Sequence, residues 1–220
     1  MLERFECKER ANVFQAPSAA PTEVVHLDAG MRTGRRISHV FLLDVPSYPR
    51  PLLITDAAIN IYPSLDEKVD IVQNAIDLAQ RLGIRTPNVA ILSALETVHS
   101  QIKATVDAAA LSKMAERGQI RGAIVDGPLA FDTAVSSEAA AIKHLNSRVA
   151  GVADVLVAPD MESGNMLVKQ LEYLGGAELA GVVLGARVPI ILTSRADSAR
   201  ARLASCAVAR LVGSATEMSH

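Results

Sequence analysis

Short apolar runs alternate with amphipathic segments along most of this chain, and this alternation constrains the fold more than any other feature. The runs are short enough for buried strands, and the segments between them repeat apolar residues at helical spacing. Because only crossover connections join parallel neighbours, the pattern predicts a mostly parallel sheet with helices on both faces. The predicted fold class is α/β, with strands over residues 39–44, 52–55, 89–92, 123–126, 155–157, 181–184 and 188–192.

The first predicted helix has the clearest boundaries. Ser64 and Glu67 form a capping box, apolar residues follow at helical spacing, and Gly83 ends the element. The prolines between the first two strands favour a turn, so these strands are predicted to pair as a hairpin. Further helices are predicted over residues 107–117, 137–145, 163–174 and 196–211.

The composition excludes several classes of function. Lys and Arg total 22 against 24 Asp and Glu, so no overall field attracts nucleic acid or an anionic membrane. An aromatic content of 3% without Trp argues against stacking platforms for single strands. No apolar run approaches the roughly 20 residues that span a bilayer, and the charged start is unlike a signal peptide. We therefore expect a cytoplasmic protein with no nucleic-acid or membrane partner.

Motifs of the common α/β enzymes are missing from the sequence. It contains no G-x-G-x-x-G run, no P-loop and no G-x-S-x-G elbow, which argues against a Rossmann dehydrogenase, a nucleotide triphosphatase and the usual hydrolases. Two cysteines, with no histidines at ligand spacing, give no metal site. Because the positive and negative charges nearly balance, any anion site must be formed by a few neighbouring residues and not by the overall charge of the protein.

Polar, Gly-rich segments follow the predicted strands. Ligands of open α/β sheets bind beyond the carboxyl ends of the strands, so we expect these segments to share one rim and to bind substrate. Turns and helix caps would explain the same residues without any ligand. The candidate substrate-binding residues are Asp56, Asn60, Asp126, Gly127, Asp160, Ser163, Gly164 and Asn165.

The segment around Ser194 is the most informative of these. It follows an apolar run and is predicted to open a helix, which leaves free N–H groups and a positive dipole end for an anion. Ser194 adds a hydroxyl and Arg195 a planar fork of donors suited to phosphate. The alternative is structural, because Ser194 and Asp197 also fit a capping box and Arg195 could be solvated.

Four segments in order resemble the phosphate acetyltransferase and phosphate butyryltransferase family: residues 55–60 (TDAAIN), 125–132 (VDGPLAFD), 159–165 (PDMESGN) and 192–195 (LTSR). The likeness runs over residues 33–212 and is greatest to the butyryltransferase branch, including the transferase part of fused enoyl-CoA hydratase/phosphate acetyltransferase proteins. It implies transfer of a short acyl group between coenzyme A and inorganic phosphate, through an acyl phosphate. It further implies coenzyme A as co-substrate, no permanently bound cofactor, and a homodimer or higher homo-oligomer.

The resemblance also implies an architecture and a catalytic centre. The fold would be a two-domain arrangement like that of isocitrate and isopropylmalate dehydrogenases, with the active site in the cleft between the domains. Residues 65–187 would form the second domain, and residues 36–64 with 188–220 the remainder of the first. Ser194 and Arg195 would hold the phosphoryl group, and Asp197 is the candidate general base, at a spacing that departs from the acetyltransferase branch.

The front of the chain departs from the family. Family enzymes carry much more chain ahead of the segment matching Thr33, whereas about 32 residues stand there and do not resemble that region. Residues 1–35 are therefore expected to be atypical and poorly ordered, and the first domain to be incomplete. This leaves a second hypothesis, a truncated relative that binds coenzyme A or a protein partner without catalysis.

Overall fold

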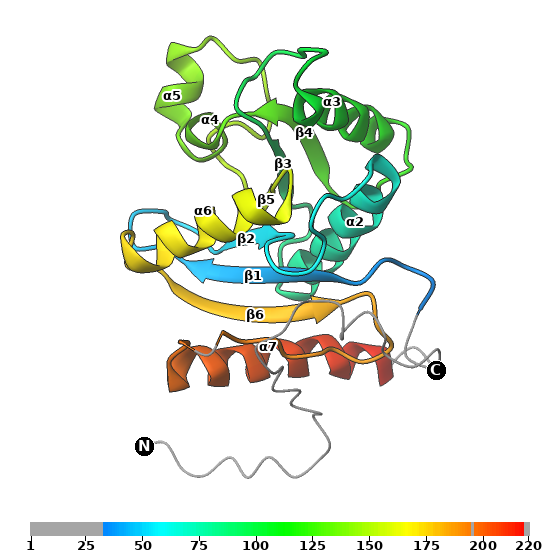
Figure 1. The fold of residues 1–220 in the computed structure, drawn as a ribbon, viewed down its shortest axis with the longest axis vertical. Coiled ribbons are helices and arrows are strands. Elements are labelled where there is room, and N and C mark those ends of the chain that lie inside the picture. Colours follow the sequence, from blue (N-terminus) through cyan, green and yellow to red (C-terminus); the bar gives the residue numbers. More distant parts are fainter. Residues whose placement is uncertain (1–32, 195, 218–220) are drawn as a thin grey trace.

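Six strands form one sheet in the computed structural model, which describes residues 33–194 and 196–217 (Figure 1). Their order across the sheet is β4-β3-β5-β2-β1-β6. The prediction of a mixed α/β protein with a mostly parallel sheet is confirmed. The strands are β1 (Ser38–Asp44), β2 (Leu52–Thr55), β3 (Asn88–Leu92), β4 (Ile124–Leu129), β5 (Val155–Val157) and β6 (Glu178–Leu184).

Strand β1 runs against both of its neighbours, while β2, β5, β3 and β4 pair in parallel. The predicted hairpin of β1 and β2 is confirmed, with Val40 opposite Thr55. Because β6 is antiparallel to β1, it points the same way as β2. The carboxyl ends of five strands therefore lie at one edge of the sheet, and the amino end of β1 lies among them.

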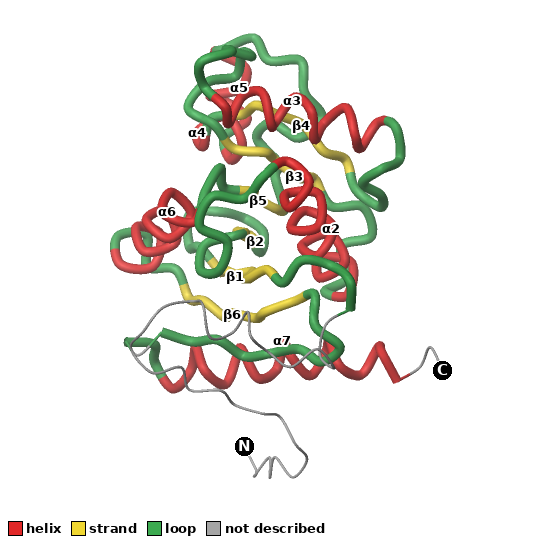
Figure 2. The backbone as a smooth tube through the Cα atoms, turned by 45° about the vertical axis from the view of Figure 1, so that its right-hand side comes forward, coloured by secondary structure: helices red, strands yellow, loops and turns green. Residues whose placement is uncertain are grey.

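Helices cover both faces of this sheet (Figure 2). Val72 of α2 and Leu111 of α3 belong to the core on one face, and Ala134 of α4 and Val168 of α6 to the core on the other. Helix α7 lies along β6 and supplies Val208 to the first core. The helices are α2 (Leu65–Arg81), α3 (Lys103–Glu116), α4 (Phe131–Val135), α5 (Ser137–Ile142), α6 (Met161–Tyr173) and α7 (Ala199–Glu217).

Helix α2 has the boundaries that the sequence indicates. The Ser64 hydroxyl accepts from the Glu67 amide, and the Glu67 carboxylate accepts from the Ser64 amide, so both halves of the capping box form. At the other end Gly83 has a φ of 95°, the left-handed conformation in which glycine ends a helix without a steric penalty. Both predicted ends of this helix are confirmed.

The predicted strand over residues 188–192 is wrong. Only Ile190 pairs with β6, exchanging two backbone hydrogen bonds with Val183. Two residues before Val183 in β6, the backbone N–H of Gly181 donates to the Ser205 hydroxyl of α7 at 2.9 Å. A helix side chain thus takes the hydrogen bond that a neighbouring strand would have made.

The predicted start of the last helix is also wrong. Helix α7 begins at Ala199 instead of residue 196, and the Ser198 hydroxyl accepts from the Ala201 amide at 3.1 Å in the manner of an N-cap. The sequence pattern offered Ser194 as a cap, whereas the structure uses Ser198. The described residues 193, 194 and 196–198 are therefore a loop ahead of the helix.

Candidate functional site

The loop after β2 is built around one buried carboxylate. Asp56 is 3% exposed and accepts five hydrogen bonds: its Oδ1 from the amides of Ala58 and Ile59, and its Oδ2 from the His39 amide and from the backbone and side-chain amides of Asn60. The Asn60 side chain also donates to the Ile37 carbonyl and accepts from Nε of Arg36. Asp56 and Asn60, which were both predicted to bind substrate, thus stabilise the conformation of this loop.

The first turn of α6 packs directly on this loop. Asp160 caps the helix, accepting from the Ser163 amide at 2.8 Å and from the Ser163 hydroxyl. A Cβ on Gly164 would lie 2.8 Å from the Asp56 carbonyl oxygen, so only glycine allows this approach. The Asn165 side chain donates to the Ala57 carbonyl at 3.1 Å. Six of the predicted residues therefore share one rim at the carboxyl ends of β2 and β5.

Asp126 and Gly127 do not join this rim. They lie within β4, the outer strand that β3 and β5 separate from β2, so the predicted turn after the strand is wrong. Pro128 is tolerated because an outer strand has one unpaired side. Packing explains the glycine at position 127, since a Cβ there would lie 2.8 Å from the Ile91 carbonyl oxygen and 3.2 Å from the Ala108 Cβ.

The loop with Ser194 and Asp197 follows a segment that turns back along β6. Ile190 pairs with Val183, and the Leu192 carbonyl lies beside Gly181, so the chain runs towards the amino end of β6. Helix α7 accordingly starts below that end of the strand (Figure 1). The chain therefore carries Ser194 away from the sheet edge at which the Asp56 rim lies. The prediction that this loop shares one rim with the other segments is wrong. Arg195 lies outside the described residues.

Asp197 is 7% exposed, and no ion pair joins it to a cationic side chain in residues 33–194 and 196–217, which is uncommon for a buried carboxylate. Its Oδ2 accepts from the Ser194 amide at 2.7 Å. Its Oδ1 is buried and has no hydrogen-bond partner in the part of the chain that the structure describes. One half of the predicted capping box therefore exists without the helix, and it leaves one carboxylate oxygen available.

His39 connects the two regions, and the sequence analysis did not select it. Its backbone amide donates to Asp56, its carbonyl accepts from the Thr55 hydroxyl, and its Nε2 lies 3.3 Å from the Leu192 carbonyl oxygen. Burial lowers the pKa of His39, although the charge of Asp56, the Leu192 carbonyl and the charge of Asp197 act in the opposite direction. The sequence feature that could have indicated His39 is a single histidine at the start of an apolar strand, which pairs with the end of β2.

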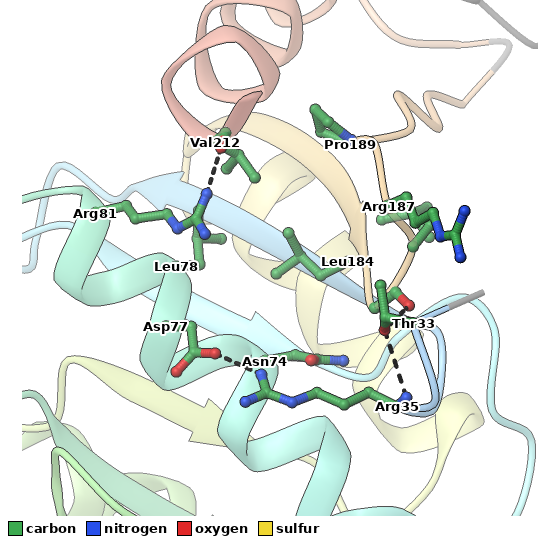
Figure 3. A pocket seen from close by; sticks show the side chains of 13 residues that line it. Thr33, Arg35, Asn74, Asp77, Leu78, Arg81, Leu184, Arg187, Pro189 and Val212 are labelled. Atoms are coloured by element: carbon green, nitrogen blue, oxygen red, sulfur yellow. Dashed lines mark hydrogen bonds and ion pairs between the residues drawn. The ribbon is translucent and has the colours of Figure 1, made fainter. Parts of the chain in front are cut away.

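One cavity contains none of the predicted site residues. It measures about 620 Å³ and lies between α2, the end of β6 and the end of α7, where Arg81 donates to the Val212 carbonyl and Arg35 pairs with Asp77 (Figure 3). A smaller cavity of about 370 Å³ is lined by Asn60 and by Arg36, whose guanidinium pairs with Glu67. No group of three or more His, Cys, Asp or Glu side chains among the described residues could hold a metal ion.

A family model described as phosphate acetyl/butaryl transferase matches residues 22–210. The chain belongs to this family. A phosphate acetyltransferase of Rhizobium meliloti is 64% identical over 86% of this chain and 60% of its own length. A phosphate butyryltransferase of Clostridium acetobutylicum is 44% identical over 86% of this chain and 63% of its own.

A solved structure of the family supports the fold. The crystal structure of a branched-chain phosphotransacylase from Enterococcus faecalis V583 superposes with a TM-score of 0.77 and 35% identity, over 84% of this chain and 67% of that one. This chain spans about 60% of the length of the Rhizobium relative. No described helix is both long enough and apolar enough to cross a membrane.

Proposed function

We propose that this chain carries a phosphotransacylase activity, in which a short acyl group moves between coenzyme A and inorganic phosphate. Coenzyme A serves as co-substrate, and no cofactor stays bound. The names of the relatives, phosphate acetyltransferase and phosphate butyryltransferase, support the reaction class. The chain length of the acyl group is left open, because both kinds of relative match.

Asp197 is the proposed general base, and one observation carries this assignment: its buried carboxylate keeps one oxygen without a partner among the described residues. A buried polar atom normally has a hydrogen-bond partner, so an exception calls for an explanation, and a catalytic role supplies one. In the proposed reaction Asp197 takes the proton of the thiol and the sulfur attacks the carbonyl carbon of the acyl phosphate. The bond from that carbon to the phosphate oxygen breaks, and phosphate leaves with the electron pair. Ser194 and Arg195 hold the phosphoryl group.

The rim around Asp56 is the proposed substrate-binding surface, together with Asp126 and Gly127. Its carboxylates are engaged inside the protein, so exposed backbone groups and the remaining side chains would meet the substrate. Asp160 already accepts from the first turn of α6. A phosphate at this helix end would compete with that carboxylate, which favours a contact with the uncharged part of coenzyme A.

The remaining parts of the proposal rest on family likeness. They are a two-domain arrangement similar to isocitrate dehydrogenases with residues 65–187 as the second domain, and a homodimer or higher oligomer. A cytoplasmic location is also proposed, on the sequence pattern and not on family likeness.

The test follows phosphate-dependent release of free thiol from acetyl-CoA and butyryl-CoA, with the wild type and the Asp197→Asn variant. We expect Asp197→Asn to lower kcat by about 10²–10⁴-fold and to leave coenzyme A binding nearly unchanged. Asp44→Asn, at the exposed end of β1, is the matched control and should keep wild-type turnover. Coenzyme A binding without phosphate-dependent thiol release would favour the non-catalytic alternative.

A further inference from the structure

The cavity between α2, the end of β6 and the end of α7 is lined by several charged side chains (Figure 3). They are Arg35, Arg81, Arg187 and Asp77, so three positive charges against one negative charge leave a net charge of +2. In Figure 3 the guanidinium groups of Arg35 and Arg81 lie on the side of α2, and Arg187 lies across from them. The cavity is therefore a local positive site on a chain whose formal net charge is -2.

Arg187 is the least committed of these cations. It is exposed, and no residue in the described ranges 33–194 and 196–217 forms a hydrogen bond or an ion pair with its side chain. The backbone just ahead of it is held, because the Thr33 hydroxyl donates to the Gly185 carbonyl at 2.7 Å. Gly185 itself has a φ of 88°, and a Cβ there would clash with the Arg36 carbonyl oxygen. A fixed backbone thus presents a cation whose side chain can turn towards a bound anion.

The other two arginines keep donors for a ligand. Arg81 donates to the Val212 carbonyl, a contact that holds its guanidinium between α2 and α7. Arg35 pairs with Asp77, and their side chains are 45% and 37% exposed. An ion pair this exposed contributes little, so a more highly charged anion can compete for Arg35. A guanidinium carries five N–H donors, which leaves both side chains able to bind phosphate oxygens.

The size and the apolar part of the cavity indicate what kind of anion fits. Its volume of about 620 Å³ lies within the range of about 300–1,000 Å³ that small-molecule pockets occupy, and a free phosphate ion would fill little of it. Leu78 of α2, Leu184 of β6, Pro189 and Val212 of α7 supply apolar surface beside the arginines. The lining therefore suits a ligand with an anionic group at one end and an apolar or aromatic body at the other.

We propose that this cavity binds an organic phosphate, with a phosphate monoester among Arg35, Arg81 and Arg187 and an apolar or aromatic body against the leucines. A phosphate monoester carries a charge of about -1.5 to -2 at pH 7, which matches the net charge of the lining. The site goes beyond the proposed function and does not rest on it, because none of the residues assigned to acyl transfer line the cavity. Two sources offer this chemistry: the phosphoadenosine end of coenzyme A and a free phosphorylated metabolite.

Calorimetric titration of the full-length chain tests the site without any turnover. The probe is adenosine 3′-monophosphate, which joins a phosphate monoester to an aromatic body. Adenosine lacks the phosphate, and inorganic phosphate lacks the body. We expect the probe to bind at least about tenfold more tightly than adenosine, and inorganic phosphate to displace it only weakly. Equal affinity for the probe and for adenosine would overturn the proposal.

Two variants change the charge of the lining in opposite directions. Arg187→Ala should weaken binding of the probe about five- to tenfold, and Arg148→Ala, an exposed arginine that lines neither cavity, should leave it unchanged. Asp77→Asn removes the only negative charge of the lining and releases Arg35, so binding should become at least about twofold tighter. A gain in affinity cannot come from a damaged fold. Unchanged binding in Arg187→Ala, or weaker binding in Asp77→Asn, would contradict the inference.

Competition identifies the source of the phosphate. If coenzyme A displaces the probe and dephospho-coenzyme A, which lacks the monoester, does not, the phosphoadenosine end of coenzyme A occupies the cavity. If neither displaces it, the occupant is a free phosphorylated metabolite, and equal displacement by both would refute a site for the monoester. Binding that depends on Arg187 in a protein without phosphate-dependent thiol release would leave this site standing and remove the proposed function. Thiol release without such binding would do the reverse.

Discussion

The side chain of Asn165 donates to the Ala57 carbonyl across 3.1 Å and so ties the first turn of α6 to the loop after β2. Gly164 makes this contact possible, because a Cβ there would lie 2.8 Å from the Asp56 carbonyl oxygen. We expect Gly164→Ala to reduce the free energy of unfolding by about 1–3 kcal/mol and to weaken coenzyme A binding. Denaturant unfolding and KM measure the two effects.

Gly213 provides the control for Gly164. It also lies in a helix, α7, but the nearest atom to a Cβ there would be Cγ of Pro189 at 3.7 Å, which is an ordinary contact. We expect Gly213→Ala to be neutral or to stabilise the protein by up to about 1 kcal/mol, because alanine favours the helix. Equal losses in the two variants would show that the fit of α6 on the rim is not the cause.

A buried ion pair joins α2 and α3. Lys68 lies 2.9 Å from Asp107, and their side chains are 5% and 7% exposed. Lys103 also contacts Asp107, but its side chain is 72% exposed. We expect Lys68→Ala to cost about 3 kcal/mol, because it removes a buried partner and leaves a cavity, and Lys103→Ala to cost under about 1 kcal/mol. Thermal unfolding of both variants compares the two losses of stability. Equal losses would contradict the expectation that the buried pair matters more.

Stability should fall below about pH 6.5 through His39. Burial lowers its pKa from the ordinary 6.5, so the unfolded chain binds the proton first as the pH falls. The free energy of unfolding should then decrease between pH 6.5 and 5.5, with a slope of up to about 1.4 kcal/mol per pH unit. The carboxyls of Glu67 and Asp107, whose pKa values are lowered, lose their contribution only at more acidic pH.

Denaturant titrations of the wild type and His39→Gln at pH 7.5, 6.5 and 5.5 measure this slope. The variant should lose stability at pH 7.5 and show a flatter dependence below it. A wild-type stability that stays constant to pH 5.5 would be incompatible with a neutral buried imidazole.

The start of α7 can be tested by two serines. Ser198 caps the helix, so Ser198→Ala should cost about 1 kcal/mol of stability. Ser194 is exposed to solvent in the loop, and among the described residues its hydroxyl accepts a hydrogen bond from the Ala196 amide alone, at 3.3 Å. Ser194→Ala should therefore change the free energy of unfolding by less than about 0.5 kcal/mol. A larger loss of stability in Ser194→Ala than in Ser198→Ala would place the helix start at Ser194.

Local signals predicted the fold well where a single interpretation fitted them. The capping box at Ser64 and Glu67 had no competitor, and α2 begins and ends as predicted. At the last helix the predicted start at residue 196 was wrong, because Ser198 and not Ser194 caps the first turn, through the Ala201 amide. The segment 188–192 is as apolar as a strand, but Ser205 of α7 takes the hydrogen bond at Gly181 that an extended pairing requires.

The candidate site was predictable only in part for a related reason. The sequence shows which residues follow the strands, and those after β2 and β5 do meet because these strands pair in parallel. It does not show that the segment after β6 reverses direction, nor that β4 continues beyond Asp126 to Leu129. His39 was missed because it stands at the start of its strand, and only the antiparallel direction of β1 brings it to the rim.

The contacts of Gly181 and Val183 with Ser205 and Ile190 also determine how copies of this chain can associate. A second chain could extend the sheet at β6 only by displacing both partners, so this strand is a poor template for intermolecular pairing. The opposite outer strand, β4, contains Pro128, which has no N–H to offer. Self-association should therefore proceed through side-chain surfaces and not through a continuous sheet shared between subunits.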